Sequence, residues 1–333
     1  MVASIKDVAK EAGVSIATVS RVLNEVDVVN IETKKKVMGA IKKLGYRPNI
    51  VARSLKTQKT STIGIVIPDI SSQIYPEIVR GAEDVANIYS YNIILCNTDL
   101  DIEKEQEYLK VLKEKMVDGV IYMSNSLEPE TMELIKELEM KMVLVEARDK
   151  EDRLPSISID NEKAACEAVE YLIEKGNKKI AFIGGSNDGY NASSLRLNGY
   201  KKALEKNSID FDENLTAFSG LKTINGYNDI CVIWAKGPVD AVFCASDEIA
   251  MGVINSLREK GIKVPEDVSV MGFDDIYAAS TFYPKLTTIA QPMYDMGSVG
   301  MRMLIKMINK KELEEEHYVL PYQLIERDSV KKK

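Results

Sequence analysis

The chain has 333 residues, of which 45% are hydrophobic and 29% charged, so it is long enough for two or three domains and wholesale disorder is excluded. Its net charge of −7, taken as an average, argues against a nucleic-acid-binding protein. The charge is unevenly distributed along the chain. Residues 1–60 contain nine Lys and three Arg against five acidic residues, a net charge of +7, and the remaining residues carry a net charge of −14. A small basic segment before a large acidic one predicts that the N-terminal end meets a polyanion.

Several classes of protein are disfavoured by motifs that the sequence lacks. No apolar run reaches the roughly 18 residues of a membrane helix, and the start, MVASIKDVAKEAG, has no apolar signal core, so we expect a cytoplasmic protein. The four cysteines form no CxxC pair and are expected to be reduced. The one histidine, His317, lies in the charged stretch LEEEHYVL and is expected to be a solvated surface residue. Without a second histidine or a phosphate-binding glycine loop, we expect no enzyme, no metal site and no cofactor.

Three short helices are predicted in the first 45 residues. Ile5 and Val8 share one face of the first helix, and Gly13 ends it. After the turn GVS, Ser15 is placed to cap a second helix, IATVSRVL, and a third follows as IETKKKVMGAIKKL before Gly45. A short helix, a glycine-containing turn and a second helix form the helix-turn-helix pattern, in which the second helix enters the DNA major groove.

A hinge is predicted at residues 49–56. The proline of RPN (47–49) disfavours a helix at the residue before it, and Asn49 is then a good N-cap for the short segment IVARSLK. Because helices below roughly 12–15 residues are marginal in water, we expect this hinge to be ordered only when docked. The polar run TQKTST (57–62) follows as a linker.

From residue 62 the pattern changes to apolar strands that alternate with amphipathic helices such as EIVRGAEDVANIY and ACEAVEYLIEKG. This alternation predicts an α/β core of parallel sheets covered on both faces. We expect two lobes, one at about 62–160 with 291–325 and the other at about 161–290, and a return to the first lobe by the helix 293–309 and the strand-like YVLPYQLIE. The predicted strands are TIGIVIP (62–68), NIILCN (92–97), DGVIYM (118–123), KMVLVE (141–146), KIAFIGG (179–185), DAVFCAS (240–246) and VSVMGF (268–273).

Two N-terminal motifs, IKDVAKEAGVSIATVSRVLN and KKLGYRPNIVARSL, resemble the DNA-binding module of the LacI/GalR family of transcriptional regulators. The resemblance continues through PDISSQIYPEIVRGAED, the SDEIAMG run at 246–252, GFDD and the terminal helix. It implies a small all-α helix-turn-helix domain with a hinge helix, followed by a two-lobed α/β core like that of periplasmic binding proteins. It further implies an allosteric repressor that binds a pseudo-palindromic operator as a homodimer.

The N-terminal residues of the second helix are the candidates for contact with bases. Ile16 and Ala17 suit thymine methyl groups, and Arg21 suits a bidentate contact to guanine, the alternative for Arg21 being a surface ion pair. By the resemblance, Leu55 of the hinge wedges between base steps in the minor groove, the alternative being a linker residue packed on the lobes. The predicted set comprises the base-contacting Ser15, Ile16, Ala17 and Arg21, the phosphate-contacting Ser4, Thr18, Ser20 and Asn24, and the hinge residues Asn49, Ala52, Arg53 and Leu55.

Polar side chains follow several predicted strands, and ligands of open α/β sheets bind at the strands' carboxyl ends. Arg196 precedes NGY at the spacing of the effector arginine in sugar-binding members of the family, and Asp274 in GFDD matches their effector carboxylate. The pair suits sugar hydroxyls or a phosphate, so a sugar phosphate is one expected effector. For Asp247 and Asp274 the alternative is capping of the helices that follow. The predicted effector-binding residues are Ser71, Ser72, Tyr75, Arg196, Asp247 and Asp274.

The terminal helix carries a second candidate site. Asp295, Val299, Arg302 and Lys306 recur at helical spacing, and an arginine and a lysine one turn apart suit a phosphate. Within the family, this stripe most resembles the surface with which regulators of carbon catabolite control in low-GC Gram-positive bacteria bind the phosphocarrier protein HPr phosphorylated on serine. The alternative is an ordinary solvated helix face. The predicted interface is Asp84, Tyr89, Tyr294, Asp295, Val299, Arg302 and Lys306.

These patterns predict a transcriptional regulator modulated by serine-phosphorylated HPr, by a sugar phosphate, or by both. The alternative is a local sugar-operon repressor that responds only to a small molecule. A solute-binding protein of the same two-lobed form is disfavoured by the basic N-terminal segment and the missing signal core.

Overall fold

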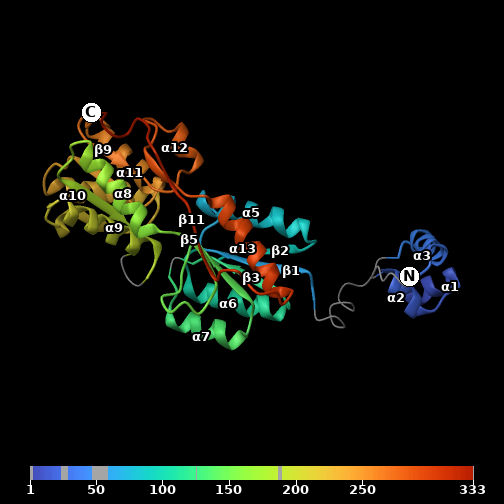
Figure 1. Ribbon diagram of the computed structural model, residues 1–333. Helices are drawn as coiled ribbons and strands as arrows, with labels where there is room; N and C mark the ends of the chain where they lie inside the picture. The colour runs from blue at the N-terminus through green and yellow to red at the C-terminus, as the bar shows by residue number, and fades with distance from the viewer. Residues whose placement is uncertain (1–2, 24–28, 47–58, 125, 187–189, 333) are drawn as a thin grey trace. The chain divides into compact units, whose positions relative to one another are not determined.

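The computed structural model describes residues 3–23, 29–46, 59–124, 126–186 and 190–332. Two compact units divide the chain between Thr60 and Ser61. Three helices lie in the described part of the first unit, and the second contains all of the described strands (Figure 1). No helix among the described residues is both long enough and apolar enough to cross a membrane.

The first unit consists of α1 (Ile5–Ala12), α2 (Ile16–Leu23) and α3 (Ile31–Leu44). Ser4 caps α1, since its hydroxyl accepts a hydrogen bond from the Asp7 amide at 3.4 Å and its own amide donates to the Asp7 carboxylate at 2.8 Å. The chain turns toward α2 at Gly13, whose φ of 66° lies in the left-handed region that glycine adopts without strain. The first helix of the predicted helix-turn-helix therefore begins after a serine cap and ends at a glycine.

A small apolar core joins the three helices. Val8 of α1, Val19 of α2 and Val37 of α3 are fully buried, as their spacing predicts. Helices this short are marginal in water on their own, so packing on this core, more than intrinsic propensity, holds α2 in place.

Two parallel sheets form the core of the second unit. Their strands, with one additional pair, are β1 (Thr62–Ile67), β2 (Asn92–Asn97), β3 (Gly119–Tyr122), β4 (Met142–Val145), β5 (Ser156–Ile159), β6 (Ile180–Gly184), β7 (Thr216–Phe218), β8 (Ala241–Cys244), β9 (Ser269–Met271), β10 (Thr288–Ala290), β11 (His317–Leu320) and β12 (Gln323–Ile325). The larger sheet has the order β11-β5-β4-β3-β1-β2 and the smaller β7-β6-β8-β9, while β10 and β12 form a separate antiparallel pair. In the larger sheet, Ile65 lies opposite Leu95 and Ile121.

Helices flank each sheet, so the second unit has two α/β lobes (Figure 1). The first lobe holds α5 (Ile74–Ile88), α6 (Ile102–Glu114), α7 (Pro129–Leu138) and α13 (Met293–Ile308), and the second holds α8 (Asn161–Glu174), α9 (Ala192–Lys206), the short helix η1 (Glu213–Leu215), α10 (Thr223–Ala235), α11 (Asp247–Glu259) and α12 (Tyr277–Thr281). The chain passes between the lobes after β5, after β10 and after β11. This architecture confirms the predicted fold class.

The helix pair α5 and α13 packs through glycine. A methyl group on Gly81 of α5 would lie 2.0 Å from the carbonyl oxygen of Tyr294, and one on Gly297 of α13 would lie 1.9 Å from the carbonyl oxygen of Ile78. Both distances are far below any van der Waals contact, so only residues without a side chain permit this approach. The two helices therefore present their outer residues as one continuous face.

Parts of the structure differ from the sequence prediction. The segment YVLPYQLIE forms two strands, β11 in the larger sheet and β12 paired with β10, because Pro321 between them has no N–H to continue a ladder. The predicted strands do not include β5, β7 and β10, because SISI alternates polar with apolar residues and TAF and TIA each begin with threonine, so none of the three forms a continuous apolar run. His317 is not simply solvated, because its Nδ1 lies 3.0 Å from the Ser156 hydroxyl in a partly buried position.

Candidate DNA-binding and effector sites

The N-terminal end of α2 presents an unusual exposed surface. Ser15 caps the helix by accepting a hydrogen bond from the Thr18 amide at 3.1 Å. Ile16 directly after it is 45% exposed, and Ala17 and Arg21 are also exposed. Apolar side chains and an arginine at this end of the second helix suit the reading of base edges in the major groove.

The other predicted DNA-binding residues fall into two groups. Ser4, Thr18 and Ser20 interact within the chain. The Ser4 hydroxyl contacts Asp7 in the cap of α1, and the Thr18 hydroxyl lies 2.9 Å from the Ser15 hydroxyl. The remaining predictions, Asn24, Asn49, Ala52, Arg53 and Leu55, lie outside the described residues.

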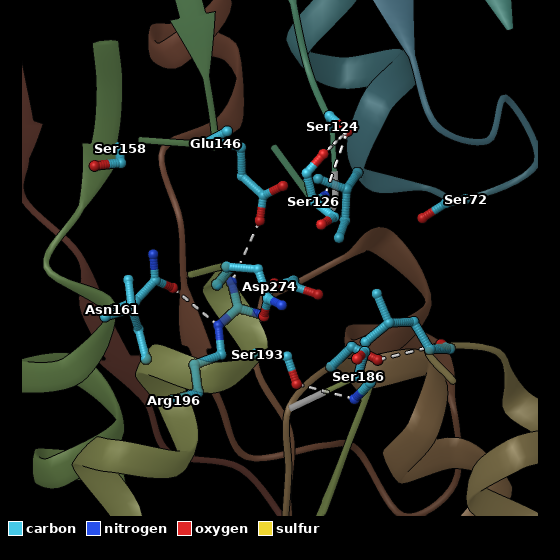
Figure 2. Close-up of a pocket in the computed structure, with 18 of the residues that line it drawn as sticks. Ser72, Ser124, Ser126, Glu146, Ser158, Asn161, Ser186, Ser193, Arg196 and Asp274 are labelled. Carbon is cyan, nitrogen blue, oxygen red and sulfur yellow. Dashed lines mark hydrogen bonds and ion pairs between the residues drawn. The ribbon is translucent and has the colours of Figure 1, made fainter. Parts of the chain in front are cut away.

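A cavity of about 570 Å³ lies between the two lobes of the second unit. Residues that follow β1, β4, β6, β8 and β9 line it, so it sits at the carboxyl ends of both sheets. Its volume falls within the roughly 300–1,000 Å³ of small-molecule sites. Figure 2 shows the polar side chains that enter it from both lobes.

Arg196 of α9 is the centre of this cavity's polar network. Its side chain is 4% exposed, and its Nε donates to Asn161 Oδ1 at 2.9 Å and its Nη1 to the Ala245 carbonyl at 2.6 Å. Its Nη1 lies 3.5 Å from Asp274 Oδ1 and its Nη2 lies 3.4 Å from Glu146 Oε1 (Figure 2). All three guanidinium nitrogens are thus engaged by the protein itself.

Burial dominates the electrostatics of the two carboxyl groups beside Arg196. Desolvation raises the pKa of Glu146, against the opposing attraction of Arg196, and it raises the pKa of Asp274 well above its ordinary value. Both residues also have positive φ, 59° for Glu146 and 115° for Asp274. Such backbone conformations are uncommon for residues with side chains and concentrate at functional sites.

The structure brings together four of the six predicted effector-binding residues. Ser72, Tyr75, Arg196 and Asp274 line the cavity, whereas Ser71 and Asp247 do not. The Ser71 hydroxyl donates to Asp69 in an exposed loop turn. Both residues follow strands, but the end of a strand does not fix which way a side chain points.

Asp247 forms hydrogen bonds in the protein interior and does not line the cavity. Its carboxylate is fully buried and accepts hydrogen bonds from the Ile276 amide at 2.9 Å and the Thr288 hydroxyl at 2.6 Å. The alternative prediction, that it caps the following helix, is wrong, because Ser246 caps α11 through the Ile249 amide. The aspartate instead fastens the segments around β9 and β10 to the start of α11.

Sequence reasoning missed Glu146 and two further contacts across the cleft. Lys222 Nζ of the second lobe lies 3.2 Å from Asp69 Oδ2 of the first, and Glu248 accepts a hydrogen bond from the Gln73 amide at 3.4 Å. Glu146 ends the predicted strand KMVLVE, so the rule that placed ligand residues after other strands would have found it. No local sequence pattern predicts that Lys222 and Glu248 contact residues of the other lobe.

The predicted partner interface lies on the first lobe, on what we call the α5–α13 face, made of Asp84, Tyr89, Tyr294, Asp295, Val299, Arg302 and Lys306. The Tyr294 hydroxyl donates to Asp84 Oδ2 at 2.7 Å and joins the two helices. Arg302 is exposed and, within the described part of the chain, makes no hydrogen bond or ion pair. Lys306 pairs with Glu314 at 2.9 Å, which raises the pKa of Lys306.

A helix-turn-helix unit with an exposed second helix, followed along the chain by a two-lobed α/β unit with a ligand-sized cavity, defines a DNA-binding transcriptional regulator. Residues 4–49 match the family described as bacterial regulatory proteins, lacI family, and residues 169–330 match a periplasmic binding protein-like domain. The chain is 70% identical to the HTH-type transcriptional regulator RegA of Clostridium acetobutylicum, across 99% of this chain and 100% of that protein. The chain belongs to the LacI family of transcriptional regulators.

Further relatives extend this assignment. Identity to catabolite control protein A of Priestia megaterium is 39%, across 98% of this chain and 99% of that protein. The structure of CcpA of Lactococcus lactis aligns with a TM-score of 0.78 and 36% identity, across 81% of this chain and 99% of that chain. The lac repressor dimer bound to operator and the anti-inducer ONPF aligns with a TM-score of 0.88 and 25% identity, across 99% of both chains. The predicted family is confirmed, and these relatives are transcriptional regulators rather than enzymes.

Proposed function

We propose that this chain is a cytoplasmic, homodimeric transcription factor of carbon catabolite control that binds a pseudo-palindromic operator with serine-phosphorylated HPr as its co-regulator. The observation that supports this co-regulator is the position of Arg302 on the α5–α13 face, where its guanidinium is exposed and has no partner among the described residues. Catabolite control protein A, at 39% identity, supports the same role. The more similar relative, RegA, is named only as a transcriptional regulator.

The geometry of the α5–α13 face suits a phosphorylated protein. A guanidinium offers a planar fork that matches phosphate oxygens bidentately, and Lys306 lies one turn away to add a second positive charge once Glu314 is displaced. Tyr89 and Tyr294 are 54% and 38% exposed on the same face. Aromatic side chains beside an arginine are typical of the energetic centre of a protein interface.

Apolar surface on the second lobe supports the dimer. Ile224 and Val232 on α10 are 59% and 57% exposed, and Tyr277 and Tyr283 on and after α12 are 80% and 82% exposed. Large apolar side chains left exposed on α10 and around α12 are of the kind that protein interfaces bury. A two-fold dimer matches a pseudo-palindromic operator, and the aligned lac repressor structure is such a dimer on its operator.

A gel-shift titration of a palindromic operator tests the proposal. We expect serine-phosphorylated HPr to increase operator affinity and unphosphorylated HPr to leave it unchanged. An Arg302→Ala chain is expected to bind operator alone like the wild type but to lose the response. If both forms of HPr act alike, the co-regulator is wrong.

The second candidate function is a local repressor that responds only to a small molecule, such as a sugar or a sugar phosphate. The buried Arg196 and Asp274 in the interlobe cavity favour it. Operator binding measured with glucose 6-phosphate and with glucose, both without HPr, distinguishes the two functions. A full response to a sugar alone supports the local repressor.

A further inference from the structure

Glu146 pairs with one branch of the Arg196 guanidinium in the interlobe cavity. Its Oε1 lies 3.4 Å from Arg196 Nη2, and its side chain is only 10% exposed. Asp274 lies on the other branch of the same guanidinium, at 3.5 Å from Nη1. The third nitrogen is taken by Asn161. With the Ala245 carbonyl, these partners engage four of the five guanidinium N–H donors. Among the described contacts, a phosphate would therefore find only one N–H of Nη2 open on Arg196, and not the paired donors that bidentate binding needs.

The other positive charges of the cavity are also paired. Of the residues described in its lining, three are cationic, and Arg148 bonds Asp152 through Nε at 2.8 Å while Lys222 pairs with Asp69 at 3.2 Å. Six lining residues are acidic: Asp69, Glu146, Asp160, Glu162, Glu248 and Asp274. Even with one of the two carboxyls beside Arg196 protonated, that buried cluster is neutral, so nothing there offsets the desolvation of an added anion.

The backbone directs Glu146 to this position. Its φ of 59° places it in the left-handed region directly after β4, while its amide donates to the Ile157 carbonyl at 2.9 Å. Glycine adopts this conformation without strain, and a glutamate there marks a residue whose side chain is needed at the site. Figure 2 shows the carboxylate aimed at the Arg196 side chain.

We propose that Glu146 is a specificity-determining residue of the cavity that excludes phosphorylated ligands and leaves uncharged polyhydroxylated ones. The proposal rests on the small-effector role of the cavity given above. Carboxylate oxygens of Glu146 and Asp274 accept hydrogen bonds from hydroxyl groups, whereas they repel phosphate oxygens. Replacement of Glu146 by glutamine keeps an acceptor for Arg196 and removes the charge that neutralises the guanidinium.

The test is isothermal titration calorimetry of the full chain with inorganic phosphate and glucose 6-phosphate. Wild-type protein is expected to show no binding to either, and Glu146→Gln is expected to gain at least about tenfold in affinity for both, because a one-charge change at close range exceeds about 1.4 kcal/mol. Glu162→Gln is the matched control, since it removes one lining charge that pairs with Lys202 and does not contact Arg196. Thermal unfolding and operator binding of each variant show that it is folded.

The outcomes separate this proposal from the function on which it rests. If Glu146→Gln gains phosphate binding and Glu162→Gln does not, the exclusion of phosphorylated ligands is supported. If no sugar alters operator binding, only the effector role of the cavity is contradicted. Wild-type protein that already binds glucose 6-phosphate, an unaltered Glu146→Gln chain, or an equal gain in Glu162→Gln overturns the exclusion.

Discussion

Arg196 Nη2 in the second lobe lies 3.4 Å from Glu146 Oε1 in the first, so a buried ion pair bridges the cleft between the lobes. A second pair, Lys222 with Asp69 at 3.2 Å, bridges the same cleft nearer the surface. The lobes of this regulator are therefore joined by the chain's own charges. A ligand that enters the cavity must exchange contacts with this network, which links cavity occupancy to the arrangement of the lobes.

Substitution of Arg21 by Ala is expected to remove a base contact. We expect a loss of about 1–3 kcal/mol in specific operator binding with non-specific binding weakened far less, since a bidentate arginine discriminates between bases. Fluorescence anisotropy with operator and scrambled DNA measures both. Lys10→Ala removes the same charge from the same unit and is expected to leave the ratio of the two affinities unchanged. An unchanged ratio in Arg21→Ala would contradict the assignment.

Arg302→Ala is expected to abolish the recognition of phosphoserine on HPr. Because the arginine has no partner within the described ranges, its removal is expected to leave the fold and the thermal unfolding temperature unchanged. Surface plasmon resonance with serine-phosphorylated HPr measures the loss, which we expect to be at least about tenfold. Lys310→Ala, two residues beyond α13, carries the same change of charge on the same lobe and is expected to bind normally. Equal losses of affinity in both variants would contradict a specific contact between Arg302 and the phosphoserine, because they would show that only the net charge of the lobe matters.

A pH-dependent contribution to stability is expected at Asp149. Arg153 bonds its carboxylate through Nε and Nη2, at 2.7 and 2.9 Å, and these bonds lower the pKa of Asp149 to about 2. The ionised carboxylate therefore stabilises the folded state above about pH 4, and this contribution is lost as the pH falls from about 4 toward 2. Asp149→Asn is expected to lower the free energy of unfolding at pH 7, with a difference from wild type that shrinks below about pH 4 in urea denaturation.

The neighbouring pair provides the control for that experiment. Arg148 bonds Asp152 with similar geometry, at 2.8 and 2.9 Å, but the Asp152 side chain is 43% exposed against 4% for Asp149. Water screens an exposed pair, so Asp152→Asn is expected to cost less. A loss of the same size at both positions, or one independent of pH, would show that the Asp149 bonds do not stabilise the loop after β4.

Gly297→Ala is expected to destabilise the first lobe, by about 1–3 kcal/mol, because the added methyl group would overlap the Ile78 carbonyl oxygen on α5. Thermal unfolding monitored by circular dichroism measures the change. Gly39→Ala in α3 meets open space and is expected to stabilise the first unit by up to about 1 kcal/mol, since alanine favours a helix. A neutral Gly297→Ala would mean that α5 and α13 separate freely.

Much of the fold follows from local sequence, because periodicity and caps are local signals. Gly13 and Ser15 mark helix boundaries that the structure reproduces, and the apolar run NIILCN is the strand β2 at its full length. The short strand β12 does not follow, since its pairing with β10 depends on residues more than thirty positions away.

The candidate cavity follows from the sequence only in part. Arg196 and Asp274 were found through their resemblance to family positions, and the structure adds that they pair with each other. Asp247 has the same residue type and a similar place after a strand, yet its carboxylate turns to Thr288. Which way a carboxylate points depends on tertiary packing, so the strand-end rule can mark Glu146 as a candidate lining residue but cannot identify it as the partner of Arg196.

The central claim is that operator DNA and the phosphorylated co-regulator act on the same regulator through coupled sites. Coupling between two binding sites is reciprocal, so operator must change the affinity for HPr by the factor by which HPr changes the affinity for operator. The most direct measurement is calorimetric titration of serine-phosphorylated HPr into the full chain with and without operator. The account predicts tighter binding with operator, by about 5–150-fold, and equal affinity in the two titrations would contradict it.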